Sequence, residues 1–250
     1  SFVMDSWIEP QEYINITAMG IHNILDSILK TCPQAKFYQA SSSEMFGNVD
    51  FSPQDENTPF FPRNPYGTSK LFAHWLTKNF REKYDLFTVS GILFNHESHR
   101  RGIQFVTRKI TYSVAKIVLG IEDKLYIGNV DARRDWGFAK EYVEAIWLMV
   151  QQDTPQDLVI GTGKNSSVLD LIKIAFDSVG LDYKEFIVFD DNLARSEKSF
   201  LISNPKKAEK ILNWKAKKSI EELIIEMVNS DIDFIKFNPN HKEILIDSIR

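Results

Sequence analysis

Short apolar runs alternate with longer amphipathic segments along most of this 250-residue chain. The apolar run at residues 36–42 is followed by a helical pattern at 65–84 and by a second apolar run at 86–94. A strand, a helix and a strand in this order normally form a parallel pair joined by a right-handed crossover. The pattern therefore predicts an α/β fold built on a parallel sheet.

The alternation continues towards the C-terminus and supports a Rossmann-like doubly wound sheet followed by a smaller α/β region. We expect helices at about 10–30, 103–119, 139–151, 167–179, 204–212 and 219–236, and strands at 125–127, 157–160 and 186–189. One apolar stripe is predicted along the first of these helices, from Ile14, Thr17, Ile21, Ile24, Leu25 and Ile28.

Composition excludes several classes of protein. The net charge of −4 and pI of about 5.8 argue against a general nucleic-acid binder. Cys32 is the single cysteine, so an intrachain disulfide and a cysteine-rich metal site are excluded, and a reducing, cytoplasmic location is expected. Apolar runs such as 145–150 are too short to span a bilayer, and no basic, apolar leader opens the sequence. We therefore expect neither a metal nor a membrane partner.

Tyr66 and Lys70 lie four residues apart at the start of the predicted helix 65–84, and so share one helix face. Asn64 is a good N-cap and Pro65 suits the first helical position. The positive helix end and the Lys70 ammonium would both lower the pKa of Tyr66 from its free value of about 10. This arrangement is typical of an acid–base group at a hydride-transfer centre.

Ser42 and Glu44 follow the apolar run 36–42, at a strand end where open α/β sheets place their sites. Each feature has a plainer interpretation, since Tyr66 and Lys70 alone are more often an ordinary helix tyrosine and a solvated lysine. The serines at 41–43 could form a polar turn only. The combination of both motifs favours a catalytic site.

With these residues in place, the chain resembles the GDP-mannose 4,6-dehydratase family of extended short-chain dehydrogenases/reductases. The matching phrases lie at residues 37–47, 58–67, 91–98, 105–110 and 133–137, with a weaker likeness at 212–215. Ser43 stands where the similar dTDP-glucose dehydratases carry aspartate. The resemblance implies conversion of GDP-mannose to GDP-4-keto-6-deoxymannose, with NADP as the cofactor.

The resemblance also implies roles for the catalytic residues. Tyr66 would take the proton of the sugar C4 hydroxyl, and Ser42 would hold the C4 oxygen. Glu44 would act as the base at C5 while water leaves from C6. Lys70 would tune Tyr66 and bind the nicotinamide ribose.

Binding residues follow from the same likeness. NADP would contact Lys70 and also Trp7, His96 and Arg101, whereas the GDP-sugar would contact Asn95, Lys109, Arg134 and Arg195. Residues 1–98 would belong to the NADP-binding domain and residues 99–250 mainly to the substrate domain, with helix 139–151 returning to the first. A homo-oligomer is expected.

The sequence departs from the family in one large respect. The glycine-rich GxxGxxG turn that holds a cofactor pyrophosphate occurs nowhere in these 250 residues. We therefore expect an N-terminally truncated chain that binds NADP poorly.

Alternatives to the implied substrate and reaction also remain. His99 replaces a proline that is usual in the family, so a related substrate such as a GDP-heptose is also possible. A GDP-sugar epimerase or reductase would keep Tyr66 and Lys70 without needing Glu44, and an inactive chain that only binds nucleotide sugar is a third hypothesis.

Overall fold

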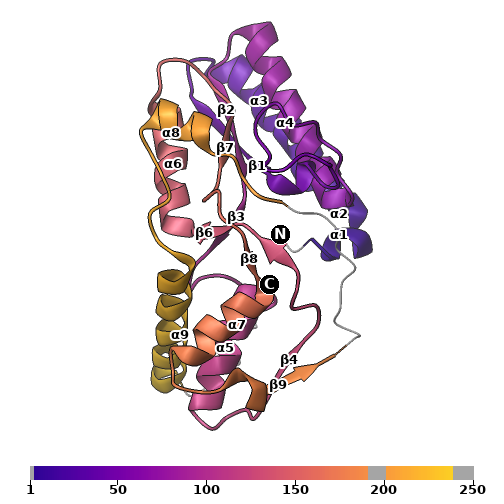
Figure 1. Cartoon of the computed structure of the whole chain (residues 1–250). Coiled ribbons are helices and arrows are strands. Elements are labelled where there is room, and N and C mark those ends of the chain that lie inside the picture. The colour runs from indigo at the N-terminus through magenta and orange to yellow at the C-terminus, as the bar shows by residue number, and fades with distance from the viewer. Residues whose placement is uncertain (1–2, 191–200, 239–250) are drawn as a thin grey trace. The chain divides into compact units, whose positions relative to one another are not determined.

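The computed structural model describes residues 3–190 and 201–238. Within them the chain divides into two compact units (Figure 1). The first unit takes in residues 1–96, 140–164 and 198–216, and the second takes in residues 97–139, 165–197 and 217–250, as far as these are described. Helix 139–151 belongs, except for its first residue, to the first unit.

A parallel three-stranded sheet forms the centre of the first unit. Its strands are β1 (Phe37–Ser42), β2 (Thr88–Leu93) and β7 (Leu158–Ile160), in the order β1-β2-β7. Every residue of β2 is buried, as expected for the central strand of a sheet covered on both faces. The register sets Ser42 opposite Leu93, so β1 and β2 end together.

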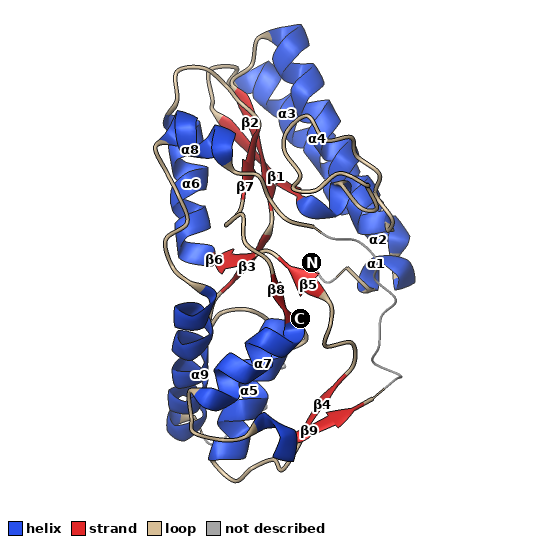
Figure 2. Cartoon of the chain, viewed as in Figure 1, coloured by secondary structure: helices blue, strands red, loops and turns tan. Residues whose placement is uncertain are grey.

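Helices cover both faces of this sheet (Figure 2). The helices α3 (Gly20–Thr31) and α4 (Pro65–Tyr84) lie on one face, and α6 (Ala139–Gln151) and α8 (Lys206–Leu212) lie on the other. On the first face Ile21 and Leu25 pack with Ala73 of α4. On the second, Tyr142, Ala145 and Met149 of α6 pack with Val89, Leu93, Leu158, Ile160, Ala208, Leu212 and Trp214.

The N-terminal helical segment differs from the prediction of a single regular helix. It consists of α1 (Asp5–Ile8), α2 (Pro10–Tyr13), a π-helical stretch η1 (Ile14–Met19) and α3. A π-helix places more residues in each turn than an α-helix, so the stretch shifts the phase of the apolar stripe. Ile21 and Leu25 are buried as predicted, but Ile14 is 43% exposed and Ile24 is 49% exposed. The prediction of one continuous stripe was therefore wrong.

The second unit is built around three packed helices, α5 (Val106–Val118), α7 (Val168–Asp177) and α9 (Ile220–Phe237). Ser167 and Ser219 form capping boxes with Asp170 and Glu222 at the starts of α7 and α9. The strand β4 (Leu125–Ile127) pairs in parallel with β9 (Ile187–Phe189), which follows the turn η3 (Tyr183–Glu185). The strand β5 (Arg133–Arg134) pairs antiparallel with β8 (Ser166–Ser167). Two further short strands are β3 (Asn95–Glu97) and β6 (Trp136–Phe138).

The predicted fold class is confirmed, because parallel strands alternate with helices as the sequence indicated. The helices at 65–84 and 139–151 have the predicted bounds. The short strands β3, β5, β6 and β8 were not predicted, since two- and three-residue strands carry no readable period. None of the helices within residues 3–190 and 201–238 is long and apolar enough to cross a membrane.

Candidate active site

The carboxyl end of β1 turns sharply into a short 3₁₀ helix, η2 (Ser43–Met45). The Ser42 hydroxyl accepts a hydrogen bond from the backbone N–H of Glu44 at 3.2 Å and so caps this turn. Met45 is fully buried and anchors the turn in the core of the first unit. Ser42 and Glu44 remain partly exposed, so their side chains are accessible to a ligand.

The N-terminus of α4 is formed by Asn64 and Pro65, as the sequence predicted. The Asn64 side-chain oxygen accepts a hydrogen bond from the backbone N–H of Gly67 at 2.7 Å, and Pro65 occupies the first helical position. The absence of a side chain at Gly67 lets this helix end approach η2 closely, since a Cβ there would lie 2.7 Å from the Glu44 carbonyl oxygen. The start of α4 and the turn η2 that follows β1 are therefore in direct contact.

A side-chain hydrogen bond joins the same two elements. Asn64 Nδ2 donates to Glu44 Oε2 at 2.8 Å, while its Oδ1 caps the helix. Both polar ends of one amide are thus used, one on the helix backbone and one on the carboxylate.

Tyr66 and Lys70 lie on the first turns of α4, beside the end of β1. The Lys70 ammonium donates to the Ala40 carbonyl oxygen of β1 at 2.9 Å and lies 5.7 Å from the centre of the Tyr66 ring. Burial lowers the pKa of Lys70 from its ordinary value of 10.5. The Tyr13 ring packs edge-on against the Tyr66 ring, with the ring centres 6.1 Å apart. The four predicted catalytic residues therefore lie in one unit, around the junction of β1 and α4.

A buried pair of polar side chains also joins β1 to α4. Ser41 and His74 of α4 are both almost fully buried, and the Ser41 hydroxyl and His74 Nδ1 are 3.0 Å apart. Burial lowers the pKa of His74 below its ordinary value of 6.5. The neutral imidazole therefore ties the helix to the strand without placing a charge in the core.

The residues predicted to hold NADP have different surroundings. Trp7 of α1 is 60% exposed. His96 Nδ1 donates to the Phe94 carbonyl oxygen at 2.9 Å, and its ring stacks on Tyr142 with 5.1 Å between ring centres. In the second unit, Arg101 forms an ion pair with buried Glu97 at 3.2 Å and its guanidinium lies 3.5 Å from the centre of the Phe105 ring. His96 and Arg101 are thus held in place by contacts within the chain.

The residues predicted to bind the GDP-sugar are also distributed over both units. Asn95 lies in β3 and is partly exposed. In the second unit, burial lowers the pKa of Lys109 of α5, and Arg134 of β5 donates to the Arg133 carbonyl oxygen at 2.7 Å. Arg195 lies outside the described residues.

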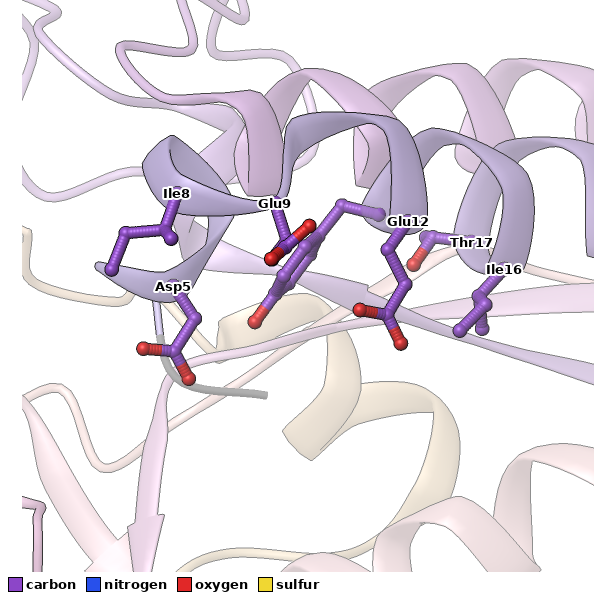
Figure 3. Close-up of a pocket in the computed structure, with 7 residues that line it drawn as sticks. Asp5, Ile8, Glu9, Glu12, Ile16 and Thr17 are labelled. Carbon is purple, nitrogen blue, oxygen red and sulfur yellow. The ribbon is translucent and has the colours of Figure 1, made fainter.

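A hollow of about 380 Å³ opens on the N-terminal helices of the first unit (Figure 3). Its lining combines carboxylates with apolar and hydroxyl side chains, namely Asp5, Ile8, Glu9, Glu12, Tyr13, Ile16 and Thr17. Three carboxylates repel a phosphate group, so the hollow does not suit the pyrophosphate of a dinucleotide. Within the described part of the chain, no group of three or more histidine, cysteine or carboxylate side chains could hold a metal ion.

Two neighbours of the predicted catalytic residues were not predicted from the sequence. The contact of Asn64 with Glu44 spans 20 residues, and the contact of Tyr13 with Tyr66 spans 53, so no local spacing connects them. The sequence indicated only that Asn64 caps a helix, because it directly precedes Pro65.

A parallel sheet covered by helices on both faces defines the first unit as a Rossmann-like α/β fold. A solved structure has a similar fold: RMD from Pseudomonas aeruginosa, complexed with NADPH, matches with a TM-score of 0.85 at 19% identity, over 93% of this chain and 78% of that one. The sequence model of GDP-mannose 4,6 dehydratase matches residues 1–227. The chain therefore belongs to the GDP-mannose 4,6-dehydratase family.

Curated relatives agree with this assignment. The GDP-mannose 4,6 dehydratases of Cricetulus griseus and Homo sapiens are each 46% identical to this chain over 247 residues, which cover 90% of the chain. The matched region spans 66% of the length of these two relatives.

Proposed function

We propose that this chain carries out the dehydration of GDP-mannose to GDP-4-keto-6-deoxymannose. The observation that carries the proposal is the glutamate at position 44, which lies in η2 just after β1 and is hydrogen-bonded to Asn64, the N-cap of the helix that holds Tyr66. An epimerase or reductase needs the tyrosine and the lysine but has no elimination step for this carboxylate. The family match over residues 1–227 supports the same reaction.

NADP is the proposed cofactor, and it supplies a hydride acceptor at the sugar C4 and a hydride donor to C6. An ammonium group has three hydrogens, and Lys70 uses one on the Ala40 carbonyl oxygen, so the others suit the ribose hydroxyls. Trp7, His96 and Arg101 are the further proposed contacts, and the RMD structure holds NADPH on a similar fold. The fit is partial, because no GxxGxxG turn occurs in these 250 residues.

Tyr66 is the proposed acid–base group at the sugar C4 hydroxyl. The nearby Lys70 ammonium and the positive end of α4 both favour its ionised form, which can accept the hydroxyl proton. The Ser42 hydroxyl donates a hydrogen bond to the C4 oxygen in this proposal. Loss of a hydride and a proton leaves a ketone at C4, which acidifies the hydrogen on C5.

Glu44 is the proposed base for that second proton. Glu44 would pass the C5 proton to the departing C6 hydroxyl, which leaves as water, and the proton that Tyr66 took from the C4 hydroxyl would return to C5 when the hydride returns to C6. The balance over the whole reaction is one GDP-mannose for one keto sugar and one water. A positioned acid or base contributes about 10²- to 10⁴-fold to the rate of such a step.

The GDP-sugar would be held by Asn95, Lys109, Arg134 and Arg195, with the arginines on phosphate groups. We also propose a homo-oligomer.

Incubation of the purified chain with GDP-mannose and saturating NADP tests the proposal, with the sugar products followed by NMR. We expect the 4-keto-6-deoxy sugar from the wild-type chain and none from Glu44→Gln. A product inverted at one carbon with all its hydroxyl groups retained would identify an epimerase instead. A melting temperature raised by GDP-mannose but not by NADP, without any product, would identify a chain that only binds nucleotide sugar.

A further inference from the structure

Asn64 does more than end a loop, because it contacts both the helix that carries Tyr66 and the carboxylate of Glu44. We propose that Asn64 is a positioning residue that fixes Glu44 for proton removal at the sugar C5. This inference rests on the proposed function and adds to it the residue that sets the geometry of the base.

Two hydrogen bonds fix the orientation of the Asn64 amide. Its oxygen accepts from the Gly67 N–H at 2.7 Å and its nitrogen donates to Glu44 Oε2 at 2.8 Å. The reversed amide would set its oxygen against a carboxylate oxygen and its N–H₂ against a backbone N–H, so both contacts would become repulsive. The amide therefore has a single favourable orientation.

The backbone gives this side chain a rigid support. Asn64 immediately precedes Pro65, whose ring restricts the backbone of both residues, and Asn64 itself is extended at φ −147° and ψ 160°. Gly67 lies against the Glu44 carbonyl oxygen in the same turn. The amide is thus held to the helix end rather than to a mobile loop.

Asparagine is well matched to both tasks. Serine is an equally good helix cap, but its side chain is shorter by one heavy atom and has no second polar group to donate to Glu44. Aspartate also caps a helix, but as a carboxylate it has no hydrogen to donate and would add a negative charge beside Glu44. Both substitutions should therefore keep the helix cap and remove the bond to Glu44.

The bond occupies Glu44 Oε2, and in this proposal the other carboxylate oxygen accepts the C5 proton. Tyr66 follows Asn64 by two residues, on the first turn of the same helix. One amide therefore sets the base at C5 in a fixed geometry relative to the acid–base group at C4. Misplacement of a reacting group by about 1 Å can cost about 10²-fold in rate.

The first experiment needs no catalytic activity. The side-chain amide signals of Asn64 are measured by ¹⁵N–¹H NMR on the full 250-residue chain and assigned by their loss in Asn64→Ser. We expect a proton shifted downfield that exchanges slowly with solvent, and we expect both properties to be lost in Glu44→Ala but kept in Glu12→Ala. Amide signals that do not change in Glu44→Ala would overturn the proposal.

The second experiment separates positioning from stability. Asn64→Ser and Asn64→Asp should lower the melting temperature less than Ser219→Ala does, because both keep the cap of α4, yet lower kcat by about tenfold to hundredfold with KM for GDP-mannose within about twofold. Reduction of NADP by the bound sugar should persist in both variants. Ser219→Ala removes the cap of α9 and serves as the control that loses stability but keeps kcat.

The outcomes distinguish this inference from the proposed function. A wild-type chain that turns over no GDP-mannose contradicts the proposed function, and the NMR signals then decide the contact of Asn64 with Glu44 alone. An active wild-type chain with unchanged kcat in Asn64→Ser and Asn64→Asp overturns the positioning role.

Discussion

Two polar clusters in this chain look alike in composition but differ in accessibility. The first lies at the start of α4 and contains Ser42, Glu44, Asn64, Tyr66 and Lys70, all of them partly exposed. The second lies between α5 and α9 in the second unit and consists of Arg108, Thr111 and Asp231, all of them buried. The comparison shows that one fold can keep a polar cluster partly exposed or bury it completely.

The buried cluster satisfies its charges internally. Asp231 accepts hydrogen bonds from Arg108 at 2.6–3.0 Å and from the Thr111 hydroxyl at 2.7 Å. Arg108 Nη1 also donates to the carbonyl oxygens of His99 and Arg101. Burial raises the pKa of Asp231, and the Arg108 guanidinium opposes this effect. In the accessible cluster, by contrast, Glu44 and Tyr66 are partly exposed, and Glu44 accepts a hydrogen bond from Asn64.

The largest expected effect lies in the accessible cluster. Tyr66→Phe removes the group that we propose exchanges the C4 proton, so turnover of GDP-mannose should fall by about 10²- to 10⁴-fold with little change in stability. Steady-state assays of product formation measure this loss. Tyr84→Phe, near the exposed end of the same helix, is the matched control and should keep full turnover. A Tyr66→Phe variant with wild-type turnover would remove the accessible cluster from catalysis.

The next largest effect lies in the buried cluster. Arg108→Met leaves the Asp231 carboxylate buried without its charge partner, which should lower the free energy of unfolding by about 3–5 kcal/mol. Urea denaturation measures the loss, and Lys30→Ala, which breaks an exposed ion pair with Asp26, should cost at most about 1 kcal/mol. Equal losses in the two variants would show that burial does not distinguish these ion pairs.

The pH dependence of stability tests the buried contact between Ser41 and His74, which lies next to the accessible cluster. Because burial lowers the pKa of His74 below 6.5, the unfolded chain binds this proton more readily than the folded chain. The contribution of His74 is therefore fully present above about pH 6.5 and is lost as pH falls towards the folded pKa, at up to about 1.4 kcal/mol per pH unit.

His74→Gln should flatten the fall in stability between about pH 7.5 and pH 5.5, as measured by urea denaturation at each pH. His22→Gln changes an exposed histidine of α3 and is the control that should keep the slope. If stability falls equally steeply in His74→Gln, groups other than His74 cause the loss of stability at low pH.

The smallest effect concerns helix caps in the two units. Ser219→Ala removes the capping box of α9 and should lower the free energy of unfolding by about 1 kcal/mol. Asn64→Ser keeps the cap of α4 and should cost less than this. A larger cost for Asn64→Ser, read in the same denaturation experiment, would mean that the bond to Glu44 stabilises the fold itself.

The sequence predicted those parts of the fold that depend on local signals. Asn64 and Pro65 marked the start of α4, and the apolar runs marked the strands of the parallel sheet. The apolar stripe through Ile14 and Ile24 failed, because a π-helical stretch depends on packing rather than on spacing.

The candidate site divides in the same way. Residues 42, 44, 66 and 70 carried recognisable phrases, and their roles stay predictions that the experiments above test. The bond between Asn64 and Glu44 could not be predicted, since it joins residues 20 positions apart through a turn and a loop without a repeating pattern. The buried pair of Arg108 and Asp231, which are 123 positions apart, was equally hidden.

Rapid mixing of the chain with GDP-mannose and saturating NADP tests the division of work between Tyr66 and Glu44 most directly. The absorbance of the reduced nicotinamide is followed in the wild-type chain, Tyr66→Phe and Glu44→Gln. We predict that the reduced cofactor accumulates in Glu44→Gln, where the C5 proton stays in place, and does not form in Tyr66→Phe. Equal reduction in the two variants, or equal loss of it, would contradict the assignment of the two residues to separate steps.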